Sequence, residues 1–137
     1  MKAFVDTSAW YAAANVKDRH HQRATELLAV GLELVTSTFV LVETWLLLQS
    51  KVGFATAEEF ASYVWLGAAK IEPAETSDLE YCWRIHDAFR DQSFSLVDRT
   101  SFAMMERLAI FKVVAFDDDF VVYRYGPDRR QAFEVLR

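Results

Sequence analysis

The sequence predicts an α/β fold in which a central, mainly parallel sheet has helices on both faces, a three-layer sandwich. Two observations lead to this prediction. Short apolar runs typical of strands alternate along the chain with segments whose apolar residues recur at helical spacing. The 137 residues have 53% hydrophobic content and no repeats, which is enough for one well-filled core. We therefore expect a single domain over residues 1–137.

The first half of the chain predicts two strands and the helices that follow them. The expected elements are a strand at 3–5, a helix at 20–30, a strand at 32–35, a helix from 37 or 38 to 49, and a helix at 56–69. The first strand runs into Asp6-Thr7-Ser8, which favours a helix start. Gly31 suits the C-terminal end of the helix at 20–30. Thr56 and Glu59 fit a capping box that opens the last helix.

The second half predicts three strands and two helices. The expected elements are an edge strand at 71–73, a helix from 76 or 77, a helix at 97–108, and strands at 113–116 and 133–136. Pro73 restricts its strand to a sheet edge, because proline cannot donate a ladder hydrogen bond. Thr76 or Ser77 suits the cap of the following helix. The nearly continuous apolar run at 113–116 is typical of a parallel strand buried on both faces.

Four acidic residues lie where an ionised carboxylate is costly unless it is paired or bound to metal. Asp6 ends the first strand, Glu43 lies within an otherwise apolar helix, Asp98 stands near a helix start, and Asp117 follows a buried strand. In open parallel sheets ligands bind beyond the carboxyl ends of the strands, so the four could face one cleft. Hard cations such as Mg²⁺ and Mn²⁺ take carboxylate oxygens and keep water for chemistry. The sequence therefore favours a divalent-metal site.

Each acid also has a simpler explanation. Asp6 and Asp98 suit helix N-caps, and residues 117–119 suit a solvated loop. The run that ends in Asp117 and Asp119 also resembles the Asp-x-Asp of phosphatases that form an aspartyl-phosphate, but too little chain follows Asp119 to complete such a sheet. No P-loop or dinucleotide-binding glycine pattern is present, and an EF-hand loop would need a glycine that the Asp117 segment lacks.

The composition indicates the cellular compartment of the protein. The only cysteine, Cys82, cannot form an internal disulfide, which favours a reducing compartment. No segment approaches the roughly twenty consecutive apolar residues of a membrane span, and Asp6 interrupts any signal-peptide core. We expect a soluble, cytoplasmic protein without a membrane partner. The net charge of −5 gives no overall attraction for nucleic acid.

Four short motifs together resemble PIN-domain ribonucleases, particularly the VapC-type toxins of prokaryotic toxin–antitoxin pairs. The motifs are Phe4-Val5-Asp6-Thr7-Ser8, Phe39-Val40-Leu41-Val42-Glu43, residues 95–103 and residues 114–120. They span almost the whole chain in the family's order. The resemblance implies an α/β sandwich, an acidic pocket for one or two Mg²⁺ or Mn²⁺ ions, and hydrolytic, endonucleolytic cleavage of RNA. By position it assigns Asp6, Glu43 and Asp98 as the core acids and Asp117 as the fourth.

One position departs from the family pattern. Members often have a hydroxyl residue two places before the fourth acid, where this chain has Ala115. Thr7, Ser8 or Thr100 could supply the missing hydrogen bond. Asp119 is a fallback ligand.

The resemblance also implies partners: an RNA substrate, a cognate antitoxin protein and a second copy of the chain in a homodimer. RNA contacts would fall to two basic clusters, listed here as Lys17, Arg19, His20, His21 and Arg23, and Arg124, Arg129 and Arg130. Trp10, Tyr11 or Phe54 could stack on unpaired bases, although core packing is the commoner use of such residues. Two alternatives share the motifs: a housekeeping RNA-processing nuclease, and a catalytically idle PIN-like RNA-binding module.

Overall fold

A computed structural model describes every residue from Met1 to Arg137. The elements in order are β1 (Lys2–Val5), α1 (Thr7–Ala14), α2 (His21–Leu28), β2 (Glu33–Ser37), α3 (Thr38–Lys51), α4 (Phe54–Tyr63), η1 (Val64–Ala68, a π-helix), β3 (Lys70–Glu72), α5 (Thr76–Ala88), α6 (Leu96–Leu108), β4 (Lys112–Val114), α7 (Asp119–Val122) and β5 (Glu134–Leu136). All five predicted strands are present, within a few residues of the expected bounds.

The five strands form one sheet in the order β3-β2-β1-β4-β5, and every neighbouring pair is parallel. β1 is the central strand: Phe4 is in register with Val35 of β2 on one side and with Val113 of β4 on the other. All three residues are buried, as expected of a parallel strand covered on both faces. β3 is an edge strand, as the proline that follows it predicts.

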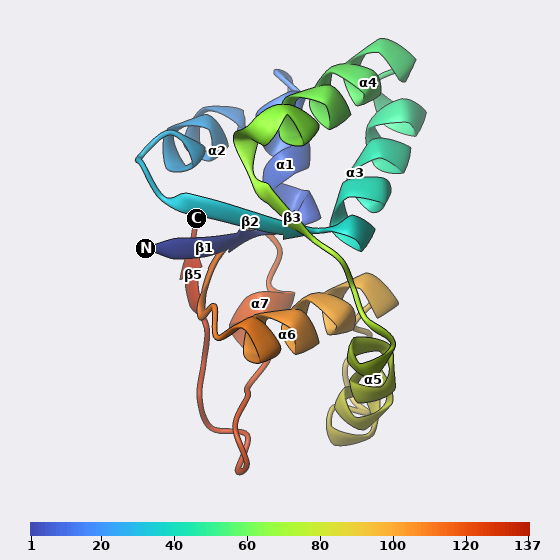
Figure 1. Cartoon of the computed structure of the whole chain (residues 1–137), viewed down its shortest axis with the longest axis vertical. Helices are drawn as coiled ribbons and strands as arrows, with labels where there is room; N and C mark the ends of the chain where they lie inside the picture. Colours follow the sequence, from blue (N-terminus) through green and yellow to red (C-terminus); the bar gives the residue numbers. More distant parts are fainter.

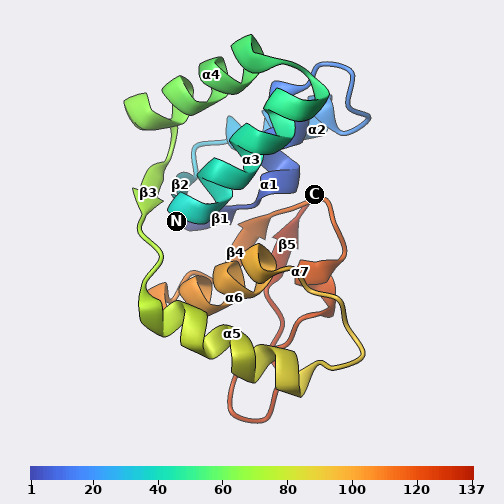
Figure 2. The ribbon, with the colours of Figure 1, turned by 90° about the vertical axis from the view of Figure 1, so that its right-hand side faces the viewer.

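Helices cover both faces of the sheet. Helices α1 to α4 lie on one side and α5 to α7 on the other, so the molecule has three layers (Figure 1), and the same layers are seen from the side in Figure 2. In the first layer the rings of Trp10 and Phe60 are 5.7 Å apart, and in the second Phe102 stacks on Tyr123 at 4.1 Å. The predicted α/β sandwich is confirmed. No helix has the length and apolar character that a membrane crossing requires.

Several helix ends differ from the prediction. Thr56 and Glu59 do not cap α4, which begins at Phe54 after Gly53, whose φ of +141° few other residues adopt. Helix α5 is capped by Glu75 and Asp78 in a capping box, and not by Thr76 or Ser77.

Other segments also depart from the expected bounds. Helix α2 ends at Leu28, before Gly31, which instead turns the chain toward β2. The helix expected to reach Ala69 changes at Val64 into the π-helix η1, which ends where Gly67 takes a φ of +117°. The short helix α7 was not predicted. It has a single turn, too short for a periodic pattern to be visible in the sequence.

The order of the strands reverses between β1 and β4, because the chain goes from β1 toward one edge and returns to β4 to build the other. Ligands bind beyond the strand ends at such a switch point. Asp6 follows β1 directly, and its backbone N–H donates to the carbonyl of Val114 at the end of β4, at 3.1 Å. The sheet thus brings the start of α1 against the segment that carries Asp117.

Candidate metal centre

Asp6 is both a helix cap and a member of a buried acidic cluster. It is 1% exposed, and its Oδ2 accepts hydrogen bonds from the backbone N–H of Ser8 at 3.1 Å and from the Ser8 hydroxyl at 2.7 Å. These bonds cap α1. Its other oxygen, Oδ1, is buried and has no hydrogen-bond partner. A buried carboxylate oxygen without a partner is costly, and a cation would satisfy it.

Asp98 and Asp117 are also held by local hydrogen bonds. Asp98 is the third residue of α6 and forms a capping box with Ser95: each side chain accepts from the other residue's backbone N–H, at 3.0 and 3.3 Å. Asp117 lies just after β4, where its Oδ1 accepts from the backbone N–H of Asp119 at 3.1 Å. The cap interpretation of Asp98 is therefore correct, and it does not compete with a role in a site.

The fold brings Asp6, Asp98 and Asp117 together. One carboxylate oxygen from each lies within 4.8 Å of the others, although the three residues follow β1, begin α6 and follow β4. Bonds of about 2.1 Å place opposite ligands of Mg²⁺ about 4.2 Å apart. Three carboxylate oxygens within 4.8 Å of one another can therefore be ligands of a single cation. The donor set, which is all carboxylate, suits a hard divalent cation.

The cluster is electrostatically strained without a cation. Burial, and next the charge of Asp117, raise the pKa of Asp6 to about 7. Burial, and next the charge of Asp6, raise the pKa of Asp98 to about 8. Burial and the charge of Asp119 raise the pKa of Asp117. Desolvation and like charge both disfavour ionisation, and a bound cation would reverse both effects.

Asp78 is a buried acid that the protein stabilises with one of its own basic side chains. It is 2% exposed, and the guanidinium of Arg107 donates to both of its carboxylate oxygens, each at 2.9 Å. None of the three clustered acids takes part in a salt bridge. The fold therefore provides Asp78 with a cationic side chain and provides none to the cluster.

Glu43 lies outside the group of three. It is half-buried on α3, and its Oε1 accepts a 2.6 Å hydrogen bond from the hydroxyl of Thr7, the residue after Asp6. The predicted set of four is therefore brought together as three clustered acids plus one that is linked to them through Thr7. Asp119 is near enough for its charge to raise the pKa values of Asp98 and Asp117, but it is likewise outside the group.

Of the three hydroxyls proposed to replace the one missing at Ala115, Ser8 has the best placement. Its Oγ donates to Asp6 and accepts from the backbone N–H of Phe116 at 2.9 Å, so it joins the segments that carry two of the acids. Thr7 contacts Glu43 instead. Thr100 is turned away from the cluster, because its hydroxyl donates to the Leu96 carbonyl at 2.7 Å.

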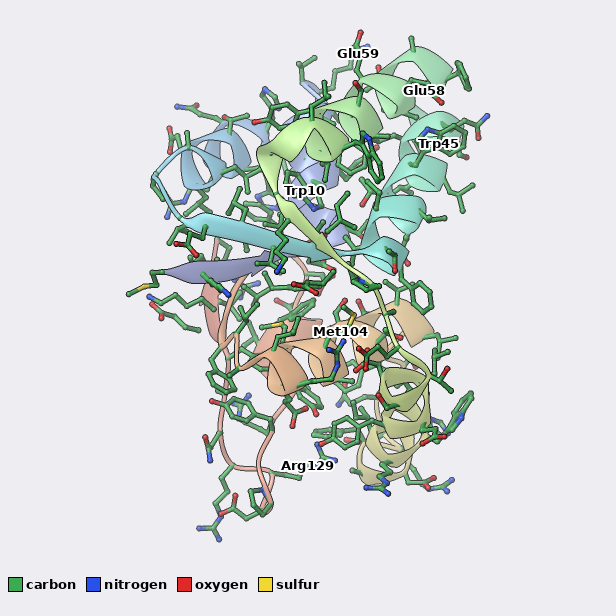
Figure 3. The ribbon with its side chains drawn as sticks, viewed as in Figure 1. Trp10, Trp45, Glu58, Glu59, Met104 and Arg129 are labelled. Carbon is green, nitrogen blue, oxygen red and sulfur yellow. The ribbon has the colours of Figure 1, made fainter.

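Two residues of the second basic cluster have structural partners. Arg124 donates to backbone carbonyls at the end of α7, and Arg129 donates to the Tyr123 hydroxyl at 2.8 Å while lying over aromatic rings. Figure 3 shows Arg129 at the far end of the α5–α7 layer, away from the sheet. Trp10 is also a core residue: it is 2% exposed, and its indole N–H donates to Thr36.

The chain is similar in sequence and in structure to proteins of a known family. Residues 3–124 match the family model of the PIN domain. The chain is 39% identical over 119 residues to the 23S rRNA-specific endonuclease VapC20 of Mycobacterium tuberculosis, which covers 85% of this chain and 90% of that protein. It superposes on the crystal structure of VapC20, described as a sarcin–ricin-loop-cleaving toxin, with a TM-score of 0.82 and 35% identity, over 87% of this chain and 92% of the other.

Two more distant structures share the fold alone. VapBC2 of Rickettsia felis, bound to a promoter DNA fragment, gives a TM-score of 0.63 at 14% identity, over 88% of this chain and 91% of the other. A toxin–antitoxin complex from Klebsiella pneumoniae gives 0.61 at 13% identity, over 85% and 88%. The match to the family model and the extended identity to VapC20 decide the assignment. This chain belongs to the PIN-domain family and is a VapC-type member of it.

Proposed function

We propose that this protein is a metal-dependent endoribonuclease and the toxin of a type II toxin–antitoxin pair. The observation that carries the proposal is the cluster of Asp6, Asp98 and Asp117, three buried or half-buried carboxylates without a cationic side chain, in a PIN domain. A protein that needed these acids only as helix caps would gain nothing from gathering them. Keeping these acids together without a cation lowers the stability of the fold, and such a cost is typical of a functional site.

Asp6, Asp98 and Asp117 would hold Mg²⁺ or Mn²⁺, with the unpartnered Oδ1 of Asp6 as one ligand atom. The bound cation supplies positive charge beside the scissile phosphate and lowers the pKa of water. Ser8 and Ser95 keep two of the carboxylates in place through the capping bonds. A carboxylate that is not fully engaged, Asp98 or Asp117, would accept the proton of the attacking water.

Glu43 would act at the edge of the centre. Thr7 holds one of its oxygens, which leaves the other free to bind water or a second cation next to Asp6. This role is weaker than that of the three clustered acids, so the loss of Glu43 should be tolerated better than the loss of Asp98.

The relative at 39% identity is specific for 23S rRNA, and its structure is described as that of a toxin that cleaves the sarcin–ricin loop. We take the same class of substrate, an exposed loop of ribosomal RNA, as the leading candidate for this chain. Proteins read such loops through unpaired bases and the phosphate backbone. A ribosomal substrate would place the protein in the cytoplasm.

The partners would be a cognate antitoxin and a second copy of the chain. An antitoxin peptide with a basic side chain would be attracted to the clustered carboxylates. A homodimer is supported by exposed apolar side chains on α3, α5 and the start of α6, which are 42–59% exposed: Val42, Leu46, Trp83 and Leu96. These three helices face the viewer in Figure 2. Exposed apolar patches of this kind mark interaction surfaces.

The direct test is incubation of intact ribosomes and of total RNA with purified protein, with Mg²⁺ or Mn²⁺ and with EDTA. We expect a discrete cut in 23S rRNA, mapped by primer extension, that disappears with EDTA and with Asp98→Asn. RNA that binds the protein but stays intact under all metal conditions would instead identify a catalytically idle RNA-binding module.

A further inference from the structure

A groove of about 810 Å³ opens directly beside the acidic cluster. One wall is shared with the metal centre, through Ser8 and Asp117. Another part of the lining, which we call the cationic wall, contains Arg19, His20 and Arg23 from the loop after α1 and the first turn of α2. The lining also includes Asp18 and the ion pair of Asp118 with Arg137, at 2.9 Å. The first basic cluster of the sequence therefore lies next to the site, whereas the second does not.

The cationic wall is fixed to the metal centre by aromatic stacking. The imidazole of His20 lies flat against the ring of Phe116, with centroids 4.6 Å apart and planes 14° apart. Phe116 immediately precedes Asp117, so the stack ties the loop to the segment that carries an acid of the cluster. Asp18 braces the loop by accepting the backbone N–H of His20 at 2.8 Å, and Arg19 Nε donates to the His20 ring at 3.1 Å.

The two arginines of this wall have charge available for a ligand. Arg19 forms no salt bridge, and Arg23 pairs only loosely with Glu26, at 3.8 Å, with both side chains about half exposed. By contrast, Arg107 is engaged by Asp78, and Arg129 by the Tyr123 hydroxyl and the surrounding rings. An exposed pair such as Arg23–Glu26 contributes little, so a phosphate can replace it at small cost.

We propose that this groove binds the RNA strand that flanks the scissile phosphate, with Arg19 and Arg23 on the neighbouring backbone phosphates. The inference rests on the proposed nuclease function and assigns the path of its substrate. A strand whose scissile phosphate lies at the acidic cluster must continue past Asp117, and the groove begins there. In a protein of net charge −5, Arg19 and Arg23 would provide local attraction for the RNA backbone beside the acidic cluster.

Tyr11 gives the groove a surface for a base. It is half-buried in the groove, and its hydroxyl accepts a hydrogen bond from the Asn15 side chain at 3.2 Å, which fixes the ring. A fixed aromatic ring can stack on an unpaired base of any sequence. The arginines would supply affinity, and Tyr11 would hold one base of the looped strand.

The test compares wild type with the double variant Arg19→Ala/Arg23→Ala in steady-state cleavage of a short RNA hairpin, at several salt concentrations and constant Mg²⁺. The control is Arg84→Ala/Arg90→Ala, which removes two exposed arginines outside the groove, one on α5 and one just after it. For the groove variant we expect KM to rise about tenfold with kcat changed less than about threefold, because phosphate contacts supply binding. The slope of log(kcat/KM) against log salt should fall by about 1.4, at roughly 0.7 per phosphate on a single strand. The control should match wild type.

Unchanged KM and salt slope in the groove variant, or an equal loss in the control, would overturn the assignment while leaving the nuclease function intact. Absence of metal-dependent cleavage by wild type would instead remove the nuclease function itself. A third outcome concerns an acidic peptide as the ligand. If oligoglutamate inhibits wild type but not the groove variant, while the KM for RNA is the same in both, the groove binds acidic peptides and not RNA.

Discussion

The two carboxylate oxygens of Asp6 have different surroundings. Oδ2 caps α1 through Ser8, and Oδ1 is buried without a hydrogen-bond partner. Asp98 combines a cap and a cluster position in the same way. The caps hold the carboxylates close together, and the cost appears as raised pKa values of Asp6 and Asp98. The proposed metal centre is thus built from two helix-capping residues, Asp6 and Asp98, and one turn residue, Asp117, which the fold has placed side by side.

The first prediction concerns cleavage. Asp98→Asn and Asp117→Asn should each lower RNA cleavage more than about 100-fold, because a lost ligand both weakens the metal and misplaces the water. Glu43→Gln should cost about 10- to 100-fold, the usual effect of a residue that acts through its neighbours. Single-turnover cleavage at saturating Mg²⁺ measures the three rates.

Asp128→Asn is the matched control for these variants, because it removes an acid from an exposed loop away from the cluster, and it should cleave like wild type. A Glu43→Gln variant that is more impaired than Asp98→Asn would mean that the four acids share the metal in a different way.

The second prediction concerns the metal-free protein and pH. The pKa of Asp98 is about 8 in the folded state, against an ordinary value of 3.8, so the folded state holds this proton more tightly than the unfolded state. Stability is therefore lost as the pH rises through about 8. In EDTA, wild type should unfold more easily at pH 8.5 than at pH 6. Asp98→Asn, which keeps an oxygen for the cap, should be more stable than wild type at pH 8.5 by on the order of 1–3 kcal/mol.

Urea unfolding at the two pH values measures this difference. An Asp98→Asn variant that is less stable than wild type at pH 8.5 would show that the carboxylate is needed for the cap and is not strained by its neighbours.

At the scale of the element, the sequence predicted the strands well, since each combines an apolar run with a following turn or cap. It also predicted that Asp6, Glu43, Asp98 and Asp117 could face one cleft, because residues that end parallel strands or begin the next helices lie at one edge of the sheet. Three of the four meet there, and Glu43 is linked to them through Thr7. The exact position of Glu43 could not be predicted from the sequence, because it depends on how α3 directs its side chain toward Thr7. Helix ends that depend on positive φ angles, at Gly53 and Gly67, left no periodic signal.

The third prediction tests how α5 and α6 are held together. Asp78 caps α5 and accepts both hydrogen bonds from Arg107 of α6. Asp78→Asn leaves the partly buried guanidinium with only the more exposed Glu75, at 3.6 Å, as counter-charge, and should cost about 3 kcal/mol of unfolding free energy. The loss should be the same with Mn²⁺ as with EDTA, since Asp78 is outside the metal centre. Stability equal to wild type in denaturant titrations would show that the pair has no net effect.

At the scale of the whole molecule, the decisive feature is the reversal of strand order between β1 and β4. It places an acid after each of these strands, and the crossover into the second helical layer adds Asp98 at the start of α6 (Figure 1). The groove that contains Arg19 and Arg23 lies beside the same cluster, and it is where the proposed RNA strand would bind. In the second layer, the Tyr123 hydroxyl donates a hydrogen bond to Glu106 and accepts one from Arg129.

The fourth prediction concerns the cell. Induced expression of the wild-type chain alone in a bacterial host should slow growth within one or two doublings, and expression of Asp6→Asn at the same level should not. Growth curves with matched protein levels on blots measure the effect. Equal growth in both cultures, together with metal-dependent cleavage in vitro, would favour a housekeeping RNA-processing enzyme over a toxin.

Thermal unfolding of wild type and Asp98→Asn in EDTA and in Mn²⁺ shows whether the clustered carboxylates bind a divalent cation. If the clustered carboxylates bind the cation, Mn²⁺ at a hundredfold excess over Kd should stabilise wild type by about 2.7 kcal/mol and the variant much less. The Asp128→Asn control should respond like wild type. A Mn²⁺ shift that is absent from wild type, or equal in wild type and Asp98→Asn, would contradict the account and leave these acids as helix caps.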